Sequence, residues 1–136
     1  MGEQYLLNFL VLRQAISLED DGYLTPSEIL TLKVDRPVVI LSACNTASSS
    51  GYQGDIYSGL ANSFFQIGAT DVIVSHWSVE SLSTRILITN TIKEVQRSRI
   101  HISDALAKTK MAMAEGKYGD LYKHPFFWSA FVSLSN

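Results

Sequence analysis

The stretch PVVIL at residues 37–41 constrains the fold more than any other, because its five apolar residues follow one another without polar alternation. Such a run is typical of a strand that is buried on both faces, as in a parallel sheet. A second β-branched run, TDVIVS, spans residues 70–75. Between the two runs, Ile56, Leu60, Phe64 and Ile67 recur at helical spacing and Gly68 provides a stop signal. The order strand, helix, strand predicts an α/β fold.

The rest of the chain continues this pattern around a single core. We expect a strand at residues 5–12, a helix from the Thr25–Glu28 capping box and Pro26 to about Lys33, helices from Ser81 to Arg97 and from Ser103 to Gly116, and a terminal strand in FFWSAFVSL after Pro125. With 136 residues, 46% of them hydrophobic, the chain has the size of one ordinary domain.

The composition argues against several classes of function. A charged content of 18%, a net charge of -2 and the lack of a Lys/Arg cluster in the sequence favour neither nucleic acid nor an anionic membrane as a partner. The longest apolar stretches fall short of the roughly 20 residues that span a bilayer. A single cysteine excludes an internal disulfide and a Cys-rich metal site, and favours a reducing, cytoplasmic setting. We expect neither a metal nor a cofactor.

The one cysteine, Cys44, follows the first buried strand at the edge where reactive groups gather in open α/β sheets. A free thiol has a pKa near 8.5, so attack on a carbonyl at neutral pH needs a base, usually a histidine. His76 follows the second strand and would open onto the same edge if the strands are parallel. If the strands are adjacent, their backbones lie about 4.8 Å apart and the side chains can meet; an intervening strand would separate them. Alternatively, Cys44 is a small buried hydrophobe.

Other conspicuous side chains have simpler explanations. His101 precedes a predicted helix cap and His124 precedes a proline in a connector, so both are interpreted as surface polar residues. Trp77 and Trp128 adjoin predicted strands and are interpreted as core or interface aromatics rather than as substrate clamps.

The blocks VVILSACNTA, GDIYSGLANSFFQIGATDVIVSHWSVES and HPFFWSAFVSL together resemble the CHAT domain, a caspase-like family of cysteine peptidases often found beside tetratricopeptide repeats. The resemblance extends from about Tyr5 to Leu134 and implies a three-layer α/β/α sandwich with a mostly parallel sheet. By position, Cys44 matches the family's nucleophile, and its backbone N–H is expected to bind the oxyanion. Asn45 and Thr46 complete the motif, Asp55 matches the loop-to-helix junction, and all three are candidate substrate-binding residues. Alternatively, Asp55 is a favourable negative charge at the amino terminus of a helix.

The sequence departs from the family at Ala47 and at residues 48–50, where the family favours glycine, and in two features that concern the catalytic base. His76 stands where the family has an apolar residue, and the family's catalytic segment, similar to His-x-x-x-His-Gly, does not occur. We therefore expect residues 1–136 to be a single partial domain, truncated at its amino-terminal side, with an open edge on the strand before Cys44. The missing part of the protein, a second copy of the chain as a homodimer, or an amino-terminal segment that folds back would cover this edge.

Two functions follow from the resemblance. The first is a cysteine endopeptidase that acts on a protein or peptide, with Cys44 as nucleophile and a histidine supplied by absent sequence, so that the isolated chain is inactive. A tetratricopeptide-repeat region of the parent protein is a candidate partner. The alternative is a non-catalytic scaffold that keeps the fold and binds a protein. A self-contained Cys44–His76 dyad is a third interpretation.

Overall fold

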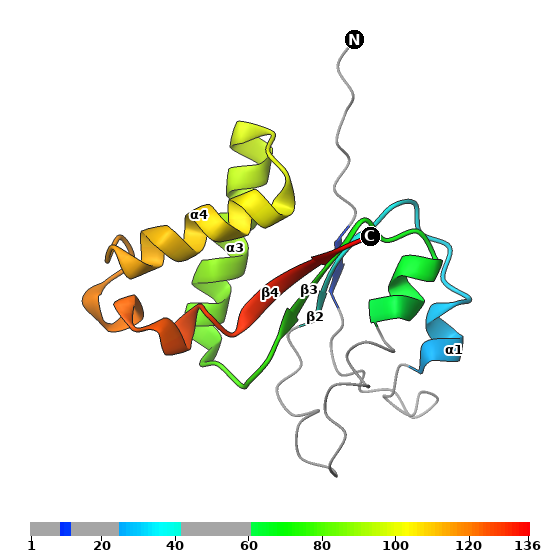
Figure 1. Cartoon of the computed structure of the whole chain (residues 1–136), viewed down its shortest axis with the longest axis horizontal. Coiled ribbons are helices and arrows are strands. Elements are labelled where there is room, and N and C mark those ends of the chain that lie inside the picture. Colours follow the sequence, from blue (N-terminus) through cyan, green and yellow to red (C-terminus); the bar gives the residue numbers. More distant parts are fainter. Residues whose placement is uncertain (1–8, 12–24, 42–60) are drawn as a thin grey trace. The chain divides into compact units, whose positions relative to one another are not determined.

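The computed structural model describes residues 9–11, 25–41 and 61–136, and its strands form one four-stranded sheet (Figure 1). The strands follow the order β1 (Phe9–Val11), β2 (Val38–Leu41), β3 (Asp71–Ser75) and β4 (Phe131–Ser135). The first three are parallel. At the two ends of β4, the Ala130 carbonyl accepts from the His76 N–H and the Asn136 N–H donates to the Thr70 carbonyl, so β4 runs antiparallel to β3. The predicted α/β class is confirmed; the three-layer arrangement stays a prediction.

Strands β2 and β3 are buried as their sequences predict. Every residue of β3 is buried, and in β2 only Ile40 is partly exposed. Val38 pairs with Asp71 and Leu41 with Val74, so the two strands are direct neighbours along their whole length. The burial of both strands thus agrees with the expectation that such runs form strands covered on both faces.

Strand β1 pairs in parallel with the other edge of β2, with Phe9 opposite Val38 and Val11 opposite Ile40. Strand β1 of the chain itself therefore covers the edge of β2 that we expected to be open. This corresponds to the third of the three expected arrangements. A homodimer stays a prediction.

The described residues fall into two compact units, of which the first holds β1, β2, most of β3 and the chain's last three residues. Its helix α1 (Pro26–Ile29) begins at the predicted capping box: the Thr25 N–H donates to the Glu28 carboxylate at 2.7 Å, and the Glu28 N–H donates to the Thr25 hydroxyl at 3.3 Å. The helix ends at Ile29 rather than Lys33, because the Thr31 and Leu32 N–H groups bond only three residues back. Residues 61–66 are helical and stop at Gly68, whose φ is 97°.

The second unit runs from Ser75 to Ser133 and contains the packed helices α3 (Ser81–Ser98) and α4 (Ile102–Ala114). Glu80 caps α3 by accepting from two backbone N–H groups. Helix α4 begins two residues earlier than predicted, because its cap is His101 rather than Ser103. The Nδ1 atom of His101 accepts from the Ser103 N–H at 3.3 Å, so Ser103 lies inside the first turn.

The predicted terminal strand is shorter than its aromatic sequence indicates. Two short 3₁₀ helices, η1 (Asp120–Lys123) and η2 (Pro125–Phe127), precede it, and β4 begins only at Phe131. The Trp128 and Ser129 N–H groups both donate to the Pro125 carbonyl, which keeps this stretch in a turn and away from the sheet. Among the helices of the described ranges, none combines the length and apolar character needed to cross a membrane.

Candidate active site

The candidate site begins at the carboxyl ends of two adjacent parallel strands (Figure 1). Leu41 at the end of β2 pairs with Val74 in β3, so the backbones that lead to Cys44 and His76 start about 4.8 Å apart. No strand intervenes between them. The sequence left open whether these strands are adjacent or separated by a third strand, and the structure shows that they are adjacent.

The residues assigned by the family motif lie outside the described ranges. Cys44, Asn45, Thr46 and Asp55 all fall within residues 42–60. Cys44 comes three residues after Leu41, and three residues of chain span at most about 11 Å. Its assignment as nucleophile, and those of the other three residues as substrate-binding groups, stay predictions.

His76 is the one candidate base that the structure describes. Its side chain is exposed, and its backbone N–H donates to the Ala130 carbonyl at 2.8 Å. Within residues 9–11, 25–41 and 61–136, no group forms a hydrogen bond with its imidazole ring. A catalytic histidine is normally oriented by a third group. The described neighbourhood of His76 supplies none.

The other two histidines serve as caps of helices. His101 begins α4, where its ring also lies 2.7 Å from the Ser103 hydroxyl. The His124 Nδ1 accepts from the Phe126 N–H at 3.2 Å and caps η2. Both side chains are exposed, which confirms their interpretation as surface polar residues.

The two tryptophans are anchored through their indole N–H groups. Trp77 donates to the Phe126 carbonyl at 3.1 Å and stacks on the Phe126 ring with centroids 6.2 Å apart. Trp128 donates to the Lys123 carbonyl at 3.3 Å. Trp77 is 38% exposed, so it is a surface aromatic that holds the turn at residues 125–127 rather than a core residue.

Two charged side chains of the second unit stabilise the ends of secondary-structure elements. Backbone N–H donors from Ser83 and Leu82 lower the pKa of Glu80, as expected for a helix-capping carboxylate. Partial burial lowers the pKa of Lys110, whose ammonium donates to the Phe131 carbonyl at the start of β4. No three His, Cys, Asp or Glu side chains gather to hold a metal ion in the part of the chain that the structure describes.

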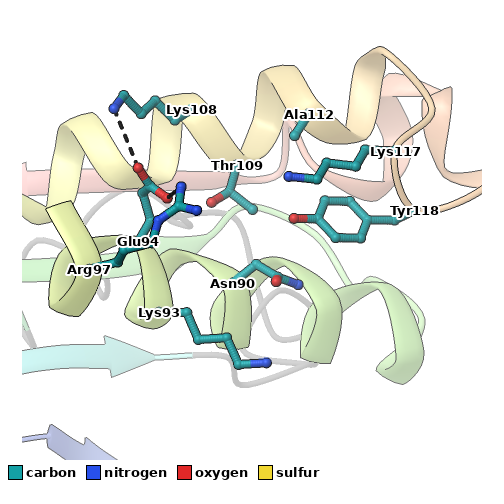
Figure 2. Close-up of a pocket in the computed structure, with 9 residues that line it drawn as sticks. All are labelled: Asn90, Lys93, Glu94, Arg97, Lys108, Thr109, Ala112, Lys117 and Tyr118. Atoms are coloured by element: carbon teal, nitrogen blue, oxygen red, sulfur yellow. Dashed lines mark hydrogen bonds and ion pairs between the residues drawn. The ribbon is translucent and has the colours of Figure 1, made fainter.

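Sequence reasoning missed a cationic hollow between α3 and α4, in the second unit (Figure 2). We call it the α3–α4 groove; its volume is about 440 Å³, and it is lined by Asn90, Lys93, Glu94, Arg97, Lys108, Thr109, Ala112, Lys117 and Tyr118. Its four cations are spread over 25 positions, from 93 to 117, and form no run in the sequence. The signal that could have found them is the placement of Lys93 and Arg97 one turn apart on the same helix face.

Comparison with known proteins identifies one family. Residues 3–136 match the CHAT domain, which is nearly the whole chain. No curated protein matches the chain. No solved structure matches it either.

Proposed function

Because the chain belongs to the CHAT domain family, we propose that it is a caspase-like cysteine endopeptidase domain in which Cys44 is the nucleophile. The observation that carries the proposal is the direct parallel pairing of β2 with β3. This pairing fixes the root of the Cys44 segment at the carboxyl edge of a sheet, where α/β enzymes place their reactive groups. The substrate is a protein or peptide.

The proposed chemistry is acyl transfer through the Cys44 sulfur. The thiol gives its proton to a base, the thiolate attacks the peptide carbonyl, and the backbone N–H of Cys44 stabilises the oxyanion. The protonated base then gives its proton to the departing amine, which leaves a thioester on the sulfur. Water hydrolyses the thioester and regenerates the thiol. In this scheme Asn45, Thr46 and Asp55 contact the substrate.

The base, in this proposal, is a histidine outside the sequence. Two of the three histidines in the chain, His101 and His124, are helix caps, and His76 has no orienting partner among the described residues. The chain by itself should therefore show little turnover. The remainder of the parent protein, including any tetratricopeptide-repeat region, is the natural source of the missing group.

Rescue by free imidazole tests the proposal on the chain as it is. We expect tens of millimolar imidazole to accelerate hydrolysis of an activated peptide ester by the wild-type chain and not by Cys44→Ala, which subtracts the catalysis by imidazole alone. His76→Ala should respond to imidazole as the wild type does. Equal rates for wild type and Cys44→Ala would refute a nucleophilic role for Cys44. Brisk imidazole-free turnover that depends on Cys44 would refute the external base.

The second candidate is a non-catalytic interaction module with the same fold, favoured by the lack of an oriented base in the described part of the chain. Alkylation kinetics distinguish the two, because the chain has one cysteine and every labelled thiol is Cys44. An inert thiol should react slowly and titrate at or above about 8.5, whether or not imidazole is added. A nucleophile whose base lies outside the chain should react faster once imidazole is added.

A further inference from the structure

We propose that the α3–α4 groove binds an acidic segment of a partner protein in extended conformation. The groove lies wholly within the second unit, and the proposal does not rest on Cys44.

The groove is strongly positive in a chain that is negative overall. Lys93, Arg97, Lys108 and Lys117 line it against the single carboxylate of Glu94, whereas the chain carries a formal charge of -2. A local excess of three positive charges in such a chain concentrates attraction for anions in one place. The ligand should therefore be anionic.

One end of the groove is closed by its own ion pairs. Glu94 accepts from Arg97 at 2.7 Å and from Lys108 at 3.4 Å, as the dashed lines in Figure 2 mark. The Ser98 hydroxyl also donates to Glu94 at 2.8 Å. That hydroxyl and the two cations lower the pKa of the carboxyl group, so Glu94 is ionised at neutral pH. Glu94 thus occupies the position that a ligand carboxylate would take.

Two further lysines line the groove, Lys93 on α3 and Lys117 beyond the end of α4. Among the described residues, Lys93 and Lys117 have no carboxylate partner. The Lys117 ammonium lies 5.9 Å from the centre of the Tyr118 ring, and Figure 2 shows the ammonium and the Tyr118 hydroxyl pointing toward the middle of the groove. The Asn90 amide N–H donates to the Ile86 carbonyl at 2.7 Å, which leaves the Asn90 carbonyl oxygen for a ligand N–H. Cations and an amide acceptor together suit a peptide with acidic side chains.

The length and layout of the groove favour a peptide over a compact phosphate. From Asn90 to Arg97 the helix advances about 10 Å, which matches roughly three residues of extended chain. A phosphate is best held by donors that converge, such as a free guanidinium fork or a helix N-terminus. Here the Arg97 guanidinium is engaged by Glu94, and no helix begins among the lining residues. Carboxylates spaced along a chain can meet the dispersed ammonium groups.

Fluorescence anisotropy with a labelled hexaglutamate peptide tests the proposal, with hexaglutamine as the uncharged control. We expect salt-sensitive binding that Lys93→Gln with Lys117→Gln weakens roughly four- to twenty-fivefold, since each exposed ion pair contributes about two- to fivefold. Glu94→Gln should bind more tightly, because it releases Arg97 and Lys108. Lys33→Gln, which removes an exposed lysine of the first unit, is the charge control for each single groove substitution and should bind as the wild type does.

Each alternative outcome overturns the proposal. Absence of hexaglutamate binding, or equal weakening by Lys33→Gln and the groove variant, would show that the attraction is not specific to the groove. Tighter binding of tripolyphosphate than of hexaglutamate, with the same response to the variants, would make the ligand a phosphate. Cys44→Ala should leave hexaglutamate binding unchanged, so failure here is distinguishable from failure of the proposed peptidase chemistry.

Discussion

A single buried hydroxyl on α3 gives the sharpest prediction about stability. Thr91 is 1% exposed, and its Oγ1 atom has no hydrogen-bond partner among the described residues. It shares the buried face of α3 with Leu87 and Val95. A hydroxyl in such a position has given up its contacts with water without replacing them. Replacing it by a methyl group should therefore stabilise the protein.

The expected magnitude follows from the cost of burying an unpaired hydroxyl, about 1–2 kcal/mol. Thr91→Val removes this cost and keeps a β-branched side chain of similar volume and helix propensity. For a chain of 136 residues, an unfolding entropy of about 2.1 cal/mol/K per residue gives roughly 0.29 kcal/mol/K. The melting temperature should then rise by about 3–7 °C.

Thermal and urea unfolding of matched variants test this reasoning. Thr109→Val is the control, because the buried Thr109 hydroxyl donates to the Ala105 carbonyl at 3.0 Å and its removal loses a bond. We expect Thr91→Val to raise the urea midpoint with an unchanged slope, and Thr109→Val to leave the midpoint unchanged or lower it. A Thr91→Val variant no more stable than the wild type would refute the claim that this hydroxyl is unsatisfied.

Two further predictions concern turns and caps. Gly68 and Gly116 adopt φ values of 97° and 86°, so Gly68→Ala and Gly116→Ala should each lower the free energy of unfolding by about 1–2 kcal/mol; urea unfolding measures both, and an unchanged midpoint would contradict the strain argument. Glu80 has a folded pKa below its ordinary value of 4.5, so its contribution to stability is present above that value and is lost as the pH falls through the folded pKa. The melting temperature of Glu80→Gln should accordingly lie below that of the wild type at pH 7, and the difference should shrink below pH 4; a constant difference would argue against an ionic cap.

The parts of the fold that were predictable are those in which local sequence and burial agree. The run at residues 37–41 is apolar throughout and the run at residues 70–75 has a β-branched apolar centre, and each contains a strand of the sheet. The Thr25–Glu28 capping box fixed the start of α1, because both of its reciprocal hydrogen bonds are local. Such signals need no knowledge of the rest of the chain.

The errors arose where a distant or unusual partner decides the structure. Phe126–Ala130 has the composition of a strand, yet hydrogen bonds to the Pro125 carbonyl hold its first part in a turn. His101 is not among the common helix caps, so Ser103 was the more obvious choice. The α3–α4 groove could not be predicted from the sequence, because it forms only when the two helices pack. At the candidate active site, the order of the strands along the chain was predicted from the sequence, but which strands are neighbours in the sheet was not.

The sheet topology limits which histidine of the chain can serve as the base of Cys44. In a parallel sheet, groups that reach a residue beyond one strand come most directly from the segments that follow the neighbouring strands. The neighbours of β2 are β1 and β3. The sequence that follows β1, residues 12–24, contains no histidine, and the first residue after β3 is His76. If His76 serves Cys44, His76→Ala slows alkylation of the single thiol. If the alkylation rate is unchanged, a catalytic Cys44 needs a base from another polypeptide segment.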